Sequence, residues 1–342
     1  MKNADFEVHP LGVQHLIPRK FRVNNLDFHY SPFTILQTFQ WALEPETIPG
    51  REDHYIQTAD GLTYDPTLDH KASGTREELD IINQHFVEND RQVKICRVVV
   101  ITLGLVECVH DRETGLYLET WPGKFLKPED RGRYEIHVLS CNEILTALQK
   151  IHAILTRHLP AEFKILLTVS PVPLANTFRD CDVIIANNYS KSSLRAAAEE
   201  FSNRHNNVDY LPVYESVMIS DRLTAWDVDL RHPSEFIVRL NVLRMLDHYS
   251  INADREVRAM DMALIEQEII DFDHRFQESW PQQLRAFRGN YGALESRLKE
   301  HMEKSEALRH SMEEEILALN KIIKRLQNSN TQYLSQLVNE EK

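Results

Sequence analysis

The sequence contains no run of about eighteen consecutive apolar residues, which is the length that a membrane-spanning helix requires. Residues 1–22 also lack the compact apolar segment of a signal peptide. These two absences argue against an integral membrane protein and against a secreted precursor. We expect a soluble chain that stays in the cytoplasm and binds no membrane.

Basic residues are also fewer than acidic residues. Lysine and arginine number 39 against 52 aspartate and glutamate residues, so the formal net charge is −13 at pH 7. A nucleic-acid-binding surface needs a basic stripe that neutralises phosphates. The charge balance therefore excludes nucleic acid from the expected partners, while the acidity itself favours solubility and indicates no function.

Cysteine is rare, and histidine, although frequent, is dispersed. The cysteines form no Cys-x-x-Cys pair, and the 16 histidines form neither a His-x-His nor a His-Glu-x-x-His cluster. Zinc sites need such closely spaced ligands. We therefore expect neither a metal nor another cofactor, and we expect buried free thiols at Cys96, Cys108, Cys141 and Cys181.

Residues 75–213 alternate between helix and strand signals. The predicted helices cover 75–88, 140–159 and 189–201, and the predicted strands cover 94–103, 164–170 and 208–213. Thr75 with Glu78, and Ser140 with Glu143, form capping boxes at two of the helix starts. The alternation is typical of an α/β protein with a parallel sheet and right-handed crossovers.

The strand at 94–103 is apolar on both faces, which is the pattern of a parallel strand buried between two helix layers. Residues 108–139, rich in glycine, proline and aromatic residues, indicate an excursion over the surface. Parallel sheets place their sites at the carboxyl ends of their strands. Gly104, Ser170 and the loop 215–232 should therefore lie along one edge of the sheet.

Asp229 and His232 stand three residues apart in that loop, before a helix that is predicted to begin at Pro233. A carboxylate at this spacing can fix the tautomer and orientation of a catalytic imidazole. The same spacing also arises by chance in many sequences, and Asp227 competes as the carboxylate partner. His232 is therefore a candidate general base, and the surrounding motifs decide whether it has this role.

Glycine and proline become scarce towards the C-terminus, where strong helix formers dominate. Apolar residues then repeat every seven positions, with isoleucine opposite leucine and Asn330 in one core series, a pattern typical of a parallel two-stranded coiled coil at about residues 294–340. An intramolecular hairpin with residues 254–280 is the alternative. We predict an α/β domain at 1–250 and a helical tail at 251–342 that makes the protein a homo-oligomer.

Five blocks of the sequence together resemble the GSCFA family, a group of bacterial proteins with an SGNH or GDSL-hydrolase-like organisation. They are ITLGLVE at 101–107, LTVSPVPL at 167–174, YSKSSLR at 189–195, YLPVYE at 210–215 and DLRHPS at 229–234. Their order and spacing are compatible with the family, and the resemblance covers about residues 20–250. It implies an SGNH-like, flavodoxin-like parallel sheet with flanking helices, followed by the all-α tail.

The motif Gly-Ser-Cys-Phe-Ala, which gives this family its name and its presumed nucleophilic serine, does not occur in the sequence. Residues 28–34 resemble the segment that follows this motif, so the nucleophile block and the first strand are expected to be missing. Either the chain is shortened at its N-terminus, which we favour because the Asp-x-x-His block is intact, or it is a catalytically dead relative. An unpaired edge at the strand that begins near Ile95 should result.

The resemblance implies acyl transfer through a covalent ester. His232 would act as the general base and then as the general acid, Asp229 would orient it, and the backbone amide of Gly104 would be a candidate oxyanion donor. Most SGNH enzymes carry an asparagine in the block near Gly104, where this sequence has Glu107. We expect a structural role for Glu107, because a carboxylate would repel an oxyanion.

Three further residues are weaker candidates for substrate binding. Ser170 could contact a substrate or satisfy the last carbonyl groups of its strand. Asn187 and Ser190, together with Lys191, stand at the start of the helix predicted at 189–201 and could bind an anion at its N-terminus. A helix-capping role is more readily expected for Ser190.

These features predict a serine esterase or O-acyltransferase lineage that acts on a bacterial glycan or a related ester, with the chain as written inactive because the nucleophile block is missing. The expected partner is an acyl ester or glycan substrate. The alternative is a non-catalytic interaction or scaffold protein that oligomerises through its coiled coil.

Overall fold

The computed structural model describes residues 9, 29–58, 61–67, 73–123, 126–227 and 229–249, together with isolated positions between 263 and 310. The chain divides into two units, Met1–Ile265 and Glu266–Lys342. The core positions of the coiled coil predicted at about 294–340 lie outside the described residues. The α/β architecture below belongs to the first unit.

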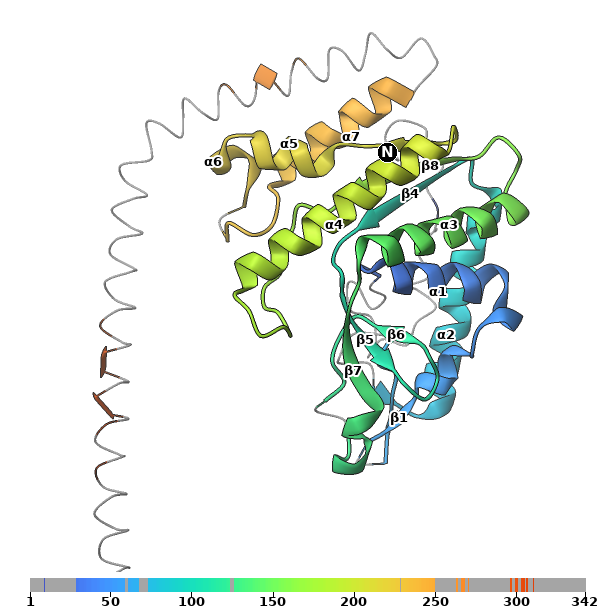
Figure 1. Cartoon of the computed structure of the whole chain (residues 1–342), viewed down its shortest axis with the longest axis vertical. Helices are drawn as coiled ribbons and strands as arrows, with labels where there is room; N and C mark the ends of the chain where they lie inside the picture. Colours follow the sequence, from blue (N-terminus) through green and yellow to red (C-terminus); the bar gives the residue numbers. More distant parts are fainter. Residues whose placement is uncertain are drawn as a thin grey trace, which may run out of the picture. The chain divides into compact units, whose positions relative to one another are not determined.

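A parallel sheet forms the centre of the first unit (Figure 1). Its strands are β4 (Val98–Leu103), β8 (Lys164–Val169) and β9 (Val208–Tyr210), in the order β4-β8-β9. β4 pairs with β8 and β8 with β9, both in parallel. The predicted parallel α/β organisation is therefore confirmed.

Three helices pack along one face of this sheet and lie side by side in Figure 1. They are α1 (Pro32–Leu43), α3 (Cys141–His158) and α4 (Val183–Arg204). Leu103 and Leu167 of the sheet and Leu148 of α3 are fully buried in this layer. Removing each such side chain from water stabilises the fold by about 1.5–3 kcal/mol, so this layer is the main core.

Two helices begin where the capping boxes predict. The Thr75 hydroxyl accepts the Glu78 amide at 3.2 Å and the Glu78 carboxylate accepts the Thr75 amide at 2.9 Å, at the start of α2 (Arg76–Asp90). Ser140 and Glu143 make the same reciprocal pair before α3. Both predictions are confirmed, because each box satisfies two free helix donors within four residues of chain.

The two faces of β4 differ, which contradicts the prediction of a strand buried on both faces. Burial alternates along β4, and the side chains of Val98 and Val100 are 50% and 48% exposed. On that face, α7 (Glu235–Tyr249) packs Met245 and Leu246 against Leu166 of β8. Within the described residues β4 is the edge strand of its sheet. Helix α7 therefore covers the neighbouring strand β8 and leaves this face of β4 exposed.

The predicted surface excursion at 108–139 is wrong, because these residues form a second sheet with its own core. Strands β5 (Glu107–Asp111), β6 (Tyr117–Leu118) and β7 (Tyr134–Val138) pair antiparallel in the order β6-β5-β7, with the 3-10 helix η6 (Pro128–Arg133) before β7. Buried Val109, Leu118 and Tyr134 pack with Ile56 and Tyr64. Short strands between turn residues give little periodicity, so sequence patterning misses them.

Several shorter elements complete this part of the first unit. A third, antiparallel sheet has the order β1-β2-β3, and 3-10 helices precede or follow it. The bounds are β1 (Ile56–Gln57), β2 (Thr63–Tyr64), β3 (Ser73–Gly74), η3 (Pro45–Thr47), η4 (Arg51–His54) and η5 (Arg91–Ile95). Helices α5 (Val213–Ile219) and α6 (Arg222–Ala225) precede α7.

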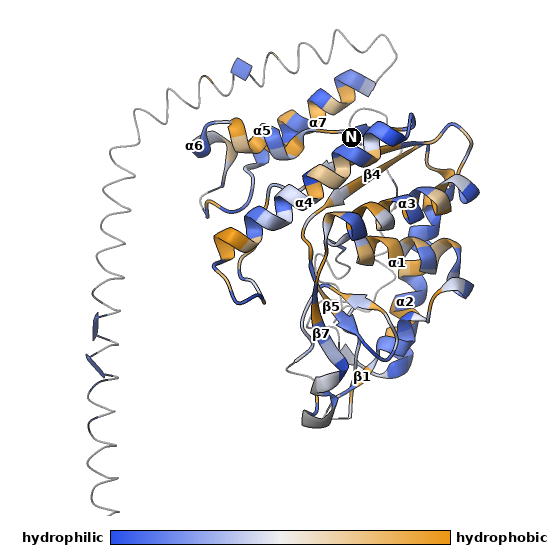
Figure 2. Cartoon of the chain, in the orientation of Figure 1, coloured by the Kyte–Doolittle hydropathy of each residue, from blue (hydrophilic) through white to orange (hydrophobic). Residues whose placement is uncertain are grey.

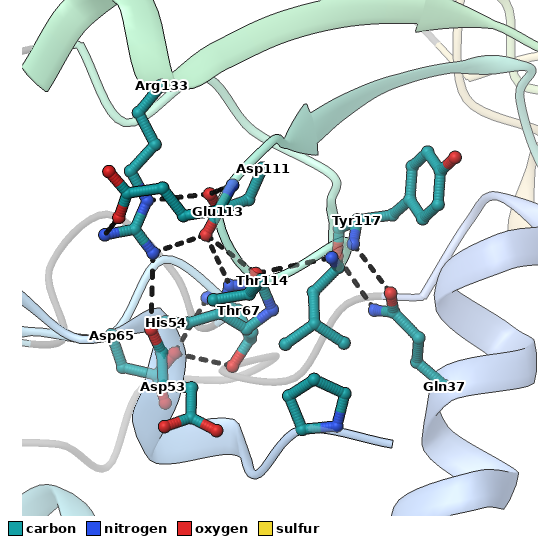
Figure 3. A network of polar contacts seen from close by, with 12 residues as sticks. Gln37, Asp53, His54, Asp65, Thr67, Asp111, Glu113, Thr114, Tyr117 and Arg133 are labelled. Atoms are coloured by element: carbon teal, nitrogen blue, oxygen red, sulfur yellow. Dashed lines mark hydrogen bonds and ion pairs between the residues drawn. The ribbon is translucent and has the colours of Figure 1, made fainter. Parts of the chain in front are cut away.

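Asp111, at the end of β5, is fully buried and joins these elements through its carboxylate (Figure 3). It accepts hydrogen bonds from Arg133 Nε at 2.7 Å and Nη2 at 2.5 Å and from Thr114 Oγ1 at 2.8 Å, and His54 Nδ1 lies 3.7 Å away. Burial alone would raise the pKa of Asp111, but the nearby His54 ring and the hydrogen bonds from Arg133 hold it well below its usual range. The ionised carboxylate therefore stabilises the folded state.

All four cysteines are free, but only Cys108 is buried, so the prediction of four buried thiols holds for one of them. Among the described helices, none combines the length and apolar character needed to cross a bilayer.

The substitution Asp111→Asn is expected to lower the free energy of unfolding by about 3 kcal/mol, because it leaves the guanidinium of Arg133 without its buried partner. The matched control Glu113→Gln, which removes the exposed partner of Arg133, should cost about 0–1 kcal/mol. Urea unfolding at pH 7 measures both. Equal losses for the two variants would contradict the assignment.

The difference in unfolding free energy between the wild type and Asp111→Asn should depend on pH, and the depressed pKa of Asp111 sets its direction. A carboxylate with a depressed folded-state pKa contributes stability above its unfolded pKa of about 3.9 and loses it as the pH falls. The advantage of the wild type over Asp111→Asn should therefore shrink below about pH 4.

Candidate functional site

The carboxyl ends of the three parallel strands meet at one edge, where Gly104 follows β4 and Ser170 follows β8. The Ser170 amide donates to the Leu103 carbonyl at 2.8 Å, and the Leu211 amide, just after β9, donates to the Leu167 carbonyl at 2.7 Å. These bonds continue the strand pairing past the strand ends. The prediction that Gly104 and Ser170 share one edge is thus confirmed by the parallel register of β4 and β8.

Asp229 and His232 are joined side chain to side chain. His232 Nδ1 lies 2.5 Å from Asp229 Oδ2, and Asp229 Oδ1 accepts the backbone amides of Arg231 and His232, both at 2.9 Å. The His232 amide first, then its imidazole and the Arg231 amide, hold the pKa of Asp229 well below its usual range. The ionised carboxylate orients the imidazole through Nδ1, and Nε2 is the ring nitrogen that does not contact it.

The backbone closes this loop on itself. Trp226 forms a β-bridge with Pro233, the Asp227 amide donates to the His232 carbonyl at 2.8 Å, and the Leu230 amide donates to the Asp227 carbonyl at 2.9 Å. Helix α7 follows at Glu235, two residues later than the predicted start at Pro233. The pair therefore sits on a hydrogen-bonded loop, and both side chains are about half exposed, 46% for Asp229 and 54% for His232.

A second contact attaches this loop to the sheet edge. Arg231 Nε donates to the Pro173 carbonyl at 3.4 Å, which lies in the loop after β8. In that loop, Ser170 is half-buried, and its hydroxyl accepts the Val172 amide at 3.3 Å. Asn187 Oδ1 accepts the Leu174 amide at 3.0 Å. Ser170 and Asn187 thus shape the loop that the Asp229–His232 segment contacts.

The predicted start of a helix at 189–190 is wrong. Helix α4 begins at Val183, where Asp182 caps it by accepting the Ile184 amide at 2.7 Å. The first turns lack an amphipathic period because Ile184 and Ile185 are 76% and 60% exposed, so sequence periodicity does not detect them. Asn187 and Ser190 therefore lie inside the helix, and the suggestion that they bind an anion at its N-terminus is wrong.

Gly104 is packed against Tyr30. Its amide donates to the Tyr30 carbonyl at 2.8 Å, and the Leu105 amide donates to the same oxygen at 3.3 Å. A Cβ at position 104 would lie 3.0 Å from Tyr30 Cβ, so a larger residue would require Tyr30 to shift. The oxyanion donor suggested by the sequence is engaged with Tyr30 in this arrangement.

The turn after β4 is also held from α4. Ser190 is fully buried, and its hydroxyl accepts the Val106 amide at 3.2 Å. Lys191 is 2% exposed, and its ammonium group donates to the Gly104 carbonyl at 2.6 Å. Burial lowers the pKa of Lys191 to about 8. Sequence spacing gives no sign of this buried lysine, because its partner is 87 positions away.

Glu107 has the structural role that the sequence suggests. It is 4% exposed and accepts hydrogen bonds from Thr177 Oγ1 at 2.6 Å and from the Phe178 amide at 2.9 Å. The buried carboxylate holds the loop between β8 and α4 against the start of β5.

The model of the GSCFA family matches residues 1–244 of this chain. The match covers the strands of the parallel sheet, the turn at Gly104 and the Asp229–His232 loop. No curated protein matches the chain.

Lys191 gives the site a measurable pH signature. A lysine whose folded-state pKa is lowered to about 8 destabilises the fold while it is charged, and this penalty is relieved as the pH rises towards its unfolded pKa of about 10.4. The difference in unfolding free energy between the wild type and Lys191→Met should therefore shift in favour of the wild type by up to about 1.4 kcal/mol per pH unit between pH 8 and 10. Parallel stability curves for the two proteins would contradict a buried, titrating lysine.

Proposed function

Since the chain belongs to the GSCFA family, we propose that its first unit is an SGNH-type domain of serine esterase or O-acyltransferase lineage, acting on a glycan or a related acyl ester. The observation that carries this proposal is the hydrogen-bonded pair of Asp229 and His232 beside the carboxyl edge of a parallel sheet. An oriented imidazole at such an edge is the part of an acyl-transfer centre that moves protons.

In the proposed chemistry, His232 Nε2 takes the proton of an attacking hydroxyl group as its oxygen bonds to the ester carbonyl. The same nitrogen then gives the proton to the leaving alkoxide as the ester bond breaks. Asp229 stabilises the imidazolium between the two steps. Ser170, at the edge of the sheet, is a proposed substrate contact.

Two groups that acyl transfer requires, a nucleophile and an oxyanion donor, are not in place in this structure. The sequence has no Gly-Ser-Cys-Phe-Ala motif to provide the nucleophilic serine, so we propose that the chain by itself does not turn over esters. The amide of Gly104 donates to Tyr30, so its proposed role as an oxyanion donor requires residues 29–31 to move away from the β4 turn.

A second candidate function is a non-catalytic interaction protein that oligomerises through the predicted coiled coil. The sheet edge favours it, because Val98 and Val100 expose apolar surface on the edge strand of the described sheet. Exposed apolar edges are typical of surfaces that a partner covers.

The esterase proposal is tested by extending the chain with the in-frame codons upstream of Met1 and assaying hydrolysis of p-nitrophenyl acetate. The chain as given should show no activity above buffer. An extended chain that carries the Gly-Ser-Cys-Phe-Ala motif should be active, and His232→Ala should lower its kcat about 10²–10⁴-fold because the general base is lost.

His248→Ala, which removes an exposed histidine of α7, is the matched control and should leave this activity unchanged. An inactive extended chain, or one whose activity survives the loss of His232, would refute the proposal. An in-frame stop codon close to Met1 would favour the interaction protein.

Self-association is tested on the full chain by light scattering. A parallel two-stranded coil predicts a particle of twice the 40.0 kDa chain mass. Replacing Ile316 and Ile323, two core positions of the heptad pattern, by aspartate should return the chain to a monomer. A monomeric wild type at high micromolar concentration would support the hairpin alternative.

A further inference from the structure

Leu230, between the two residues of the proposed catalytic pair, has an unusual backbone. Its φ of 54° lies in the left-handed region, and among the described residues it is the only non-glycine residue with a positive φ. A β-carbon is strained in this conformation, which glycine or asparagine adopts more easily. The bonds of the Leu230 amide to Asp227 and of the next two amides to Asp229 hold it there.

The side chain of Leu230 gains little from the fold in return for this strain. It is 51% exposed, so about half of an isobutyl group faces solvent. Non-glycine residues held in the left-handed region cluster at active sites and ligand-binding sites. Packing within the folded chain therefore does not account for the conformation of Leu230.

Apolar side chains are also exposed along the segment from the end of β8 into α4. Phe178 is 48% exposed, and its amide donates to the carboxylate of Glu107 at the start of β5. Ile184 and Ile185 form the first turn of α4, which follows β8, and Figure 2 shows this end of the helix as strongly hydrophobic. The hydrogen bond from Arg231 to the Pro173 carbonyl brings the Leu230 loop to the loop between β8 and α4.

We propose that Leu230 is a specificity-determining residue that contacts a hydrocarbon acyl group of about four or more carbons on the ester that His232 serves. This inference rests on the proposed function, and it names the acyl part of the substrate. Leu230 stands in the short loop segment between Asp229 and His232, and it is the exposed apolar side chain of that segment. Each methylene that Leu230 and its neighbours cover should raise affinity about fourfold.

The test measures binding without turnover. Octanoate, butyrate and acetate, the carboxylate products of such esters, are titrated into the full chain by calorimetry. The wild type should bind octanoate at least tenfold more tightly than acetate. Leu230→Asn, which tolerates the left-handed backbone but is polar, should lose that preference, and Leu230→Met should keep it within about threefold.

Two further variants separate specificity from folding. Leu230→Gly should raise the melting temperature, because it relieves the left-handed strain, and still lose the octanoate preference. Ile81→Asn, at an exposed apolar residue of α2, should leave octanoate binding unchanged. A wild type without chain-length preference, or a Leu230→Asn variant that keeps it, would overturn the assignment.

These measurements distinguish failure of the role proposed for Leu230 from failure of the proposed esterase function. A preference for octanoate that depends on Leu230 would support the acyl site even if the extended chain hydrolyses no ester. Hydrolysis without a chain-length preference would support the esterase and overturn the role of Leu230.

Discussion

The parallel pairing of β4 with β8 determines where every part of the candidate site lies. Six register pairs, from Val98 with Lys164 to Leu103 with Val169, bring the two strands to the same end point. The turn after β4 and the loop after β8 therefore start side by side, and α4 leaves from that loop. The Asp229–His232 segment reaches the same edge through the bond from Arg231 to Pro173.

The turn after β4 is fixed by bonds from two directions. Tyr30 accepts its amides, and Tyr30 is held in turn because Glu119 accepts the amides of Tyr30 and Ser31. Lys191 binds the carbonyl of Gly104 from the helix side. A rigid edge of this kind can position a substrate, but it also engages the amide that would stabilise an oxyanion. The esterase proposal therefore predicts a displacement of residues 29–31 during the reaction, whereas a purely interacting protein needs none.

The antiparallel sheets depend on a different interaction. Asp111 is buried and ionised, and it joins β5 to Arg133 at the end of η6 and to His54 in η4. Ion pairs of this kind add little net stability compared with an apolar core, but the loss of one partner is costly. The ion pairs of Asp111 determine which short strands pair with each other. Strands of two to five residues have too few apolar positions to specify a register on their own.

The sequence by itself determined what depends on neighbours within a few residues. The capping boxes at Thr75 and Ser140, the apolar runs of β4 and β8, and the Asp229–His232 pair are all local, and the structure contains each of them. The family resemblance from these blocks also agrees with the family match.

Only the tertiary structure decided which face of β4 is covered, where α4 begins, and what Gly104 and Lys191 bind. The partners in these cases are far apart in the chain, as with the 87 positions between Lys191 and Gly104. Such contacts follow from packing, and packing leaves no fixed spacing in the sequence. The exposed isoleucines at the start of α4 and the left-handed Leu230 also depart from the sequence patterns, because neither position follows an apolar period.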